Sequence, residues 1–423
     1  MKYHLIGDQG VSMRGVKKYL EHQGHVVTGS DLKTGGHKAE NVAKDVGVVV
    51  RTSAVSPGSP GWVEVDAAKH HGAVILKRSE IIGQLTKGKR LIAISGMHGK
   101  TTVTSMAGLV LEAAGFDPTV LVGDQVADFN NDVIRIGRSG WFVLEACEYD
   151  RSFLDFSPEI LILTNIEEEH LDTYPGGLPE IKEAFVQYIH RISPDGVIIA
   201  CAEDNNVKEV IDKANVKTKV IWYGGHTKYD TLDFQISVPG KHNILNALAV
   251  VALADYLQIN RSIVSATLDK FKNVHRRFEL IGQYRGADLI DDYGHHPTEI
   301  KATLAALKER YPSKRRVVVF WPHQYKRILP LIDDFAGSFN DADLVIVKPI
   351  FFVPGRDEEL PISSKDLVRK INAKSNNAKF LETDAEIAEY LSSDLDKESV
   401  LLTIGIPPVY KIAEILLGEK NDR

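Results

Sequence analysis

Short apolar runs alternate with helix-like patterns along almost all of this 423-residue chain, and this alternation limits its possible folds more than any other feature. The runs at residues 91–94 and 289–292, for example, each lead into polar residues and then into a helical pattern. After the first of these runs, apolar residues recur at the spacing of one buried helix face. Strand–helix alternation of this kind predicts α/β layers built on parallel sheets.

The stretch GMHGKTT at residues 96–102 lies between a predicted strand and a predicted helix, where a phosphate-binding loop belongs. Its glycines would let backbone N–H groups approach an anion, and the helix N-terminus adds a favourable dipole. Lys100 would reach the outer phosphates of a nucleotide, and the Thr101 hydroxyl would ligate Mg²⁺. The simpler alternative is a tight turn that merely contains a lysine. The residues expected to hold the nucleotide here are Gly96, His98, Gly99, Lys100, Thr101 and Thr102.

The chain is too long for one hydrophobic core, because single cores stop growing beyond about 250–300 residues. Polar stretches near residues 86–90 and 275–279 separate three groups of strand and helix patterns. We therefore predict a Rossmann-like N-terminal domain over residues 1–88 and a central P-loop-type ATPase domain over residues 89–278. A Rossmann-like C-terminal domain would cover residues 279–423.

Charge and cysteine content narrow the class of protein. The formal net charge of -6 argues against a broad surface for nucleic acid or anionic membrane, so neither is expected as a partner. No apolar run approaches the length of a membrane span. Only Cys147 and Cys201 occur, which makes a disulfide framework improbable and a reducing cytoplasm the simplest location. We expect a monomer or a weak homodimer.

Polar groups at two further strand ends could bind a metal ion. Glu145 closes a predicted strand, and His170 follows another in LTNIEEEHLDTY. Because ligands gather at the carboxyl ends of strands in open α/β sheets, these side chains could hold Mg²⁺ near the phosphates. The alternative for residues 167–169 is a solvated acidic loop.

Three stretches in the last third of the chain could also contact substrates. DDYGHHPTEI at 291–300 follows a predicted strand, so Asp292 could bind a ribose hydroxyl. His295 or His296 could accept a proton or bind an anion, unless this is only a capped turn. Arg277 in HRRFE could stabilise a transferring phosphoryl group, or form a salt bridge between domains. WPHQYKR also follows a predicted strand and could bind a carboxylate or phosphate through His323, Lys326 or Arg327.

These stretches resemble the motifs of the Mur ligase family, in the family's order and over nearly the whole chain. The resemblance implies three domains: one for a UDP-sugar, a central ATPase, and a C-terminal domain that closes over the ATP and the amino acid. It also implies the cofactors ATP and Mg²⁺. The matching motifs are G-x-H-G-K-T-T, E-A-x-E with SFL, TNIE-x-x-HLD-x-Y, PGKHNILNALA at 239–249, RRFE, DDYGHHPTEI and P-H-x-Y-x-R.

The implied reaction attaches an amino acid to the lactyl carboxylate of UDP-N-acetylmuramate and cleaves ATP to ADP and phosphate. DDYGHHPTEI with RRFE is similar to the branch of the family that adds L-alanine. By this resemblance Glu145 and His170 would be metal ligands, with Thr101. Asn243 would contact adenine and Asp292 the ribose. The residues implied in catalysis are Lys100, Arg277, His295 and Arg327. The residues expected to contact the UDP-sugar or the amino acid are Gly7, Gly10, Ser30, Asp31, Ser53 and His323.

One departure from the wider family supports the alanine-adding branch, and three others leave the added amino acid open. Phe185 stands where several members carry a carbamylated lysine, although the alanine-adding branch also lacks that lysine. Cys147 replaces an aspartate and Gln324 an arginine, while residues 405–408 read G-I-P-P rather than G-A-G-D.

Three other functions stay open. A related ligase adds a whole tripeptide to the same UDP-sugar. IGDQGVSMRG at the N-terminus is a weak dinucleotide fingerprint, which keeps an NAD-dependent oxidoreductase as an alternative. The altered positions would also suit a non-catalytic nucleotide-binding regulator.

Overall fold

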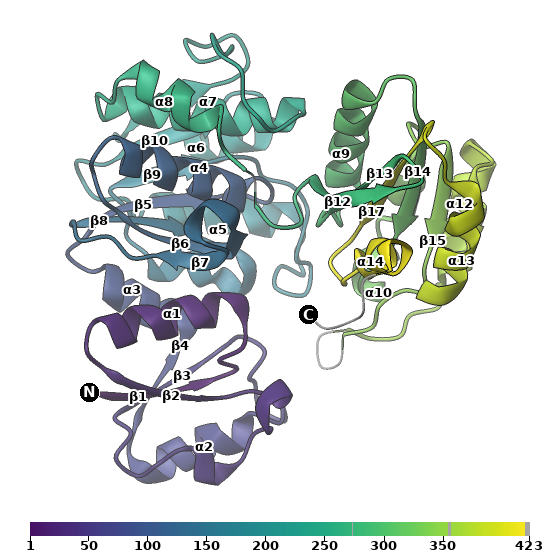
Figure 1. Ribbon diagram of the computed structural model, residues 1–423. Coiled ribbons are helices and arrows are strands. Elements are labelled where there is room, and N and C mark those ends of the chain that lie inside the picture. The colour runs from purple at the N-terminus through teal and green to yellow at the C-terminus, as the bar shows by residue number, and fades with distance from the viewer. Residues whose placement is uncertain (273, 354–356, 419–423) are drawn as a thin grey trace. The chain divides into compact units, whose positions relative to one another are not determined.

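The computed structural model describes residues 1–272, 274–353 and 357–418. Within them the strands form three sheets of four, seven and six strands (Figure 1). The chain divides into two compact units, one of Met1–Ser237 with Asn243–Val274, the other of Val238–His242 with the chain from His275 onward. The first two sheets lie in the first unit and the third sheet lies in the second. The predicted α/β class is confirmed, while the domain boundaries at 88/89 and 278/279 stay predictions.

The first sheet is parallel, with the strand order β2-β1-β3-β4. Figure 1 shows two of its helices on opposite faces, where the alternating apolar side chains of the strands are covered. The strands are β1 (Lys2–Ile6), β2 (Val26–Ser30), β3 (Val48–Arg51) and β4 (Val74–Lys77). The helices are α1 (Val11–His22), α2 (Trp62–His71) and α3 (Arg78–Thr86).

The second sheet has the order β11-β10-β9-β5-β8-β6-β7, and β7 pairs antiparallel with β6 at one edge. Strand β5 lies in its middle, so the loop that follows β5 opens at the carboxyl edge of the sheet. The strands are β5 (Arg90–Ser95), β6 (Thr119–Val126), β7 (Asp132–Arg135), β8 (Trp141–Glu145), β9 (Ile160–Leu163), β10 (Val197–Cys201) and β11 (Lys219–Tyr223). The helices are α4 (Lys100–Ala113), α5 (Leu178–Ile189), α6 (Asn205–Ala214), α7 (Lys241–Tyr256) and α8 (Arg261–Leu268).

The third sheet has the order β12-β13-β17-β14-β15-β16, with β12 antiparallel to β13 and apolar clusters on both faces. Its strands are β12 (Glu279–Tyr284), β13 (Ala287–Asp292), β14 (Arg315–Phe320), β15 (Leu344–Val347), β16 (Ala378–Phe380) and β17 (Ser399–Ile404). The helices are α9 (Pro297–Arg310), α10 (Tyr325–Ile328), α11 (Ile332–Ala336), α12 (Ser364–Lys374), α13 (Asp384–Asp394) and α14 (Lys411–Leu417). Among the described residues, no helix combines the length and apolar character needed to cross a membrane.

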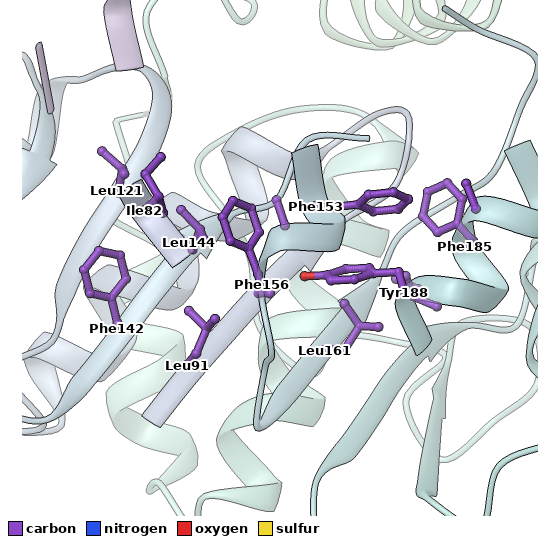
Figure 2. Close-up of a cluster of buried hydrophobic side chains, with 14 of the residues drawn as sticks. Ile82, Leu91, Leu121, Phe142, Leu144, Phe153, Phe156, Leu161, Phe185 and Tyr188 are labelled. Atoms are coloured by element: carbon purple, nitrogen blue, oxygen red, sulfur yellow. The ribbon is translucent and has the colours of Figure 1, made fainter. Parts of the chain in front are cut away.

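One continuous apolar core joins the first sheet to the second. Figure 2 shows Ile82 of α3 beside Leu121 and Leu144 of the second sheet, and all three belong to this cluster. Helix α1 lies directly on β6, because a Cβ on Gly15 would come within 2.4 Å of the Leu121 side chain. The first two predicted domains therefore fold as one compact unit rather than as separate bodies.

Candidate active site

The phosphate-type loop is built as the sequence predicts, between β5 and α4. Gly96 has φ +135° and Gly99 has φ +81°, values that favour glycine. A Cβ on Gly96 would lie 2.1 Å from the Thr164 hydroxyl, and one on Gly99 would lie 2.5 Å from the Asn246 side-chain oxygen. Both glycines are therefore required by the backbone conformation and by close packing.

The end of β9 anchors this loop. The backbone N–H of His98 donates to the Asn165 side chain at 2.8 Å, and the Thr164 hydroxyl donates to the His98 carbonyl at 2.7 Å. The Nε2 atom of His98 lies 3.8 Å from a Glu167 carboxylate oxygen. The TNIE stretch thus holds the loop in shape, a function that the sequence did not indicate.

Lys100 folds back into the loop rather than extending to solvent. Its ammonium donates to the Met97 carbonyl at 2.9 Å and lies 3.0 Å from the Glu148 carboxylate. The residue is only 9% exposed. Burial opposes the charge, but the Glu148 carboxylate outweighs it and raises the pKa of Lys100. The neighbouring Thr101 and Thr102 are also buried, at the first turn of α4.

Glu148 is the carboxylate at which the loop and the predicted metal histidine meet. It is 0% exposed, and the Nε2 atom of His170 lies 3.2 Å from its Oε1. Burial raises the pKa of Glu148, yet Lys100 and His170 outweigh burial and hold that pKa at about 2. Glu148 was not among the residues predicted for the site, although it is the second glutamate of the E-A-x-E motif, which was the available signal.

Glu145, the other glutamate of this motif, ends β8, and its charge is among the causes that raise the pKa of Lys100. Its carboxylate accepts the backbone N–H of Gly123 at 2.7 Å, at the end of β8. Of the acidic residues between β9 and His170, Glu168 is exposed and Glu169 is buried. The hydroxyl, carboxylate and imidazole groups near Lys100 are suitable donors for a hard cation beside phosphates.

The structure shows what surrounds two of the departures from the family pattern, Cys147 and Phe185. Burial raises the pKa of the Cys147 thiol to about 11, so this position carries no negative charge at neutral pH. Phe185 is fully buried and packs edge-on against Phe153, with ring centroids 5.1 Å apart. An aromatic cluster fills the place where other members carry a modified lysine (Figure 2).

Asn243, the expected adenine contact, is buried on α7 one turn before Asn246. Their side chains are 3.3 Å apart, and the Asn246 oxygen packs against Gly99. The structure therefore brings Asn243 close to the phosphate-type loop within the first unit.

The second unit gathers several of the residues expected near the substrates at the start of α9. Arg277 lies over the Tyr293 ring at 5.1 Å, and its guanidinium is 3.6 Å from Glu299. The Nδ1 atom of His295 is 3.4 Å from the same carboxylate. Asp292 is buried and accepts the backbone N–H groups of Phe278 and Gly294 together with the Thr303 hydroxyl. Burial is the main cause that raises its pKa.

Arg276, the first arginine of RRFE, has a structural function inside the second unit. It pairs with Asp291 at 2.8 Å and donates to the carbonyls of residues 405–407. Tyr293 and Tyr410 lie beside its guanidinium, with centroid distances of 5.3 and 5.1 Å. For the arginines of this motif, the alternative expected from the sequence was a salt bridge between domains. The Arg276–Asp291 salt bridge instead lies within the second unit.

His323 and Arg327 lie together in the segment that follows β14. An Arg327 guanidinium nitrogen is 3.2 Å from the His323 Nδ1 atom, and the His323 ring stacks on Phe351 with centroids 5.7 Å apart. Gln324 begins α10 with φ +68°. A positive φ is uncommon for a residue other than glycine.

The residues expected to bind the UDP-sugar lie along the carboxyl edge of the first sheet. Gly7 has φ +84° and donates its N–H to the Ser30 carbonyl at 2.7 Å, while Gly10 caps α1. The Ser30 hydroxyl donates to the buried Glu64, and Asp31 caps a short 3₁₀ turn. The hydroxyl and the carbonyl of Ser30 are therefore both hydrogen-bonded within this part of the chain.

Two basic side chains at this edge were not predicted. Lys77 and Ser53 both contact the Asp150 carboxylate, at 3.1 and 2.9 Å. Arg78 contacts the hydroxyl of Ser12, in the first turn of α1. Arg78 supplies positive charge beside the N-terminus of α1, where a diphosphate would be favourable.

Three family models match the chain. They are described as the Mur ligase family, catalytic domain at residues 2–90, the Mur ligase middle domain at 94–233, and the Mur ligase, glutamate ligase domain at 276–406. Among solved structures, the UDP-N-acetylmuramate–alanine ligase of Thermotoga maritima superposes with a TM-score of 0.81 at 25% identity, covering 99% of this chain and 98% of that one. A murein peptide ligase from Psychrobacter arcticus superposes with a TM-score of 0.69 at 21% identity, with the same coverage, which shows a shared fold.

Curated relatives are similar over their full length. The UDP-N-acetylmuramate–L-alanine ligase of Caldanaerobacter subterraneus is 36% identical, covering 99% of this chain and 98% of the relative. That of Clostridium tetani is 37% identical, covering 98% of each. The first alignment spans 460 positions against the 423 residues of this chain, so part of the relative has no counterpart here. This full-length similarity agrees with the three matched domains and the loop geometry: the chain belongs to the Mur ligase family.

Proposed function

We propose that this enzyme uses ATP and Mg²⁺ to join L-alanine to the lactyl carboxylate of UDP-N-acetylmuramate. The observation that carries the proposal is the 36–37% identity, over 98–99% of the chain, to relatives named for that activity. The convergence of Lys100 and His170 on Glu148 supports it from the structure. We infer a cytoplasmic location for two reasons. The proposed reaction consumes ATP, and the two free cysteines suit a reducing compartment.

The chemistry requires charge compensation before any bond can form. The substrate carboxylate must attack a phosphoryl group that is also negative, and each pair of unit charges at ~4 Å repels by about 4 kcal/mol at an effective dielectric near 20. Bound Mg²⁺ would withdraw charge from the phosphoryl oxygens. Lys100, and Arg277 on the second unit, are the cations of this chain proposed to offset the rest.

The resulting acyl phosphate is then open to attack by the amine of L-alanine, with phosphate as the leaving group. The amine must first lose a proton, and His295 is the proposed acceptor because Glu299 and the Tyr293 carbonyl hold its imidazole. We propose that His323 and Arg327 bind the alanine carboxylate, since an imidazole and a guanidinium form a suitable anion contact.

Phosphate release with ATP, Mg²⁺ and UDP-N-acetylmuramate tests the proposal when single amino acids are supplied in turn. We expect turnover with L-alanine, less with glycine or L-serine, and none in the Lys100→Ala variant. Turnover only with the tripeptide L-alanyl-D-glutamyl-diaminopimelate would instead favour the related recycling ligase. No acceptor-dependent turnover with any of these would refute the ligase and favour a regulatory nucleotide-binding function.

A further inference from the structure

Glu148 contacts two parts of the site, one expected to bind the nucleotide and the other expected to bind the divalent cation. Lys100 belongs to the loop after β5, and His170 to the loop after β9. Both contact the Glu148 carboxylate, Lys100 at 3.0 Å and His170 through Nε2 at 3.2 Å. Glu148 itself follows β8, and the Tyr174 hydroxyl donates to its backbone carbonyl at 2.6 Å. Three neighbouring loops of the second sheet are thus tied to one buried group.

The charge balance of this cluster depends on both partners. A buried charge that loses its partner is strongly destabilised, because no water is available to replace the interaction. Glu148 is wholly buried, so it must keep an adjacent positive charge. When nucleotide phosphates draw the Lys100 ammonium toward themselves, part of that balance is removed.

The orientation of His170 indicates where a replacement charge would come from. Nε2 is directed at the Glu148 carboxylate at 3.2 Å, so this nitrogen is the N–H donor to Glu148. A carboxylate that fixes an imidazole in this way is the usual support of a metal-binding histidine. The Nδ1 atom lies 4.0 Å from a Glu169 carboxylate oxygen, so acidic oxygen also faces that side.

We propose that Glu148 is a positioning residue that couples nucleotide binding to divalent-cation binding. In the empty enzyme it holds Lys100 back from the phosphates. Once nucleotide phosphates attract the Lys100 ammonium, the negative charge of Glu148 is less well balanced. This uncompensated charge favours the binding of a cation at His170. By linkage, the cation must then tighten nucleotide binding by the same factor. The inference rests on the proposed ATP site.

ADP binding to full-length wild-type and Glu148→Gln protein, measured by calorimetry in EDTA and in Mg²⁺, tests the coupling. In EDTA the glutamine variant is expected to bind ADP about 10-fold more tightly, because Lys100 is no longer held by a carboxylate. The factor by which Mg²⁺ improves ADP binding is expected to fall at least 10-fold below that of the wild type. Glu180→Gln is the control, since its carboxylate pairs with Arg151 and is expected to leave both factors unchanged.

A second readout does not depend on nucleotide. The ¹⁵N chemical shifts of His170 are expected to report the Nε2–H form in the wild type and a mixture of tautomers in Glu148→Gln. If the glutamine variant melts far below the wild type, the Glu148→Asp variant provides the test instead. It retains the negative charge, so Mg²⁺ is expected to improve its ADP binding as in the wild type.

Three results would overturn the inference. They are equal or weaker ADP binding by a well-folded Glu148→Gln in EDTA, an unchanged Mg²⁺ enhancement in that variant, and loss of the enhancement in Glu148→Asp. If the wild type binds no ADP under any condition, the proposed ATP site is wrong and the coupling is refuted with it. Normal wild-type binding with unaltered variants refutes the coupling alone.

Discussion

Replacing Glu64 by glutamine tests how much one buried carboxylate contributes to the N-terminal sheet. Glu64 lies on α2 and is 0% exposed. The Ser30 hydroxyl and the Asn41 amide donate to it at 2.6 and 2.7 Å. His4 Nε2 and the Lys38 backbone N–H lie 3.1 Å from its oxygens. The carboxylate thereby joins β1, the end of β2 and the segment at 36–41.

The magnitude follows from its proton affinity. Burial raises the pKa of Glu64, but the bonds from His4, Ser30 and Asn41 outweigh it and lower that pKa from 4.5 to about 2. At 1.36 kcal/mol per pKa unit, this corresponds to about 3 kcal/mol of stability. Because the pKa is lowered on folding, this stability is present above pH 4.5 and is lost as the pH falls toward 2. Glutamine also directs an N–H₂ group at a donor, which costs ~1–3 kcal/mol.

We therefore expect Glu64→Gln to lower the free energy of unfolding by about 3–5 kcal/mol at pH 7, and the gap to the wild type to narrow at pH 3. Hydrogen exchange over residues 26–41, combined with urea unfolding at both pH values, measures local and global loss separately. Glu40→Gln, an exposed carboxylate in the same segment, is the matched control. A gap of equal size at pH 7 and pH 3, or a variant as stable as the wild type, would refute the reasoning.

Three further expectations concern the rest of the molecule. Gly99→Ala is expected to weaken ADP binding at least 10-fold in calorimetry, because its Cβ would lie 2.5 Å from Asn246; unchanged affinity would contradict this. Arg276→Lys is expected to destabilise the second unit by ~3 kcal/mol in thermal melts, because it weakens a buried ion pair with Asp291. Arg277→Lys is expected to leave the melting temperature unchanged and to raise the KM for ATP. Chelation by EDTA is expected to stop ATP-dependent phosphate release, and excess Mg²⁺ to restore it; activity in EDTA would exclude a metal requirement.

Much of the fold could be predicted from the sequence because the α/β alternation is local information. The predicted strand at 91–94 and the loop at 96–102 agree with β5 and the start of α4. The union of the first two domains could not be predicted in this way. It depends on α1 packing against β6, where Gly15 meets Leu121, and no short-range pattern specifies which distant surface covers a helix.

The residues of the candidate site also fall into those that the local sequence could predict and those that it could not. Strand ends correctly indicated where polar groups such as Lys100 and His170 gather, since this follows from parallel topology. The choice of Glu148 over Glu145 as the shared carboxylate could not be predicted, because residues three apart after a strand can point in different directions. Likewise, the structural function of Arg276 could not be predicted, because it depends on contact with the distant loop at 405–407.

The shared core beneath the first two sheets limits how this polypeptide can be dissected. A cut at residue 88 would leave Ile82 and Leu121 without their common neighbours, so neither fragment would have a complete interior. Expressed alone, the first 88 residues are expected to aggregate or to remain unfolded. A cut at residues 274–275 would instead leave the first unit whole, and would separate the second unit only from its short segment at 238–242.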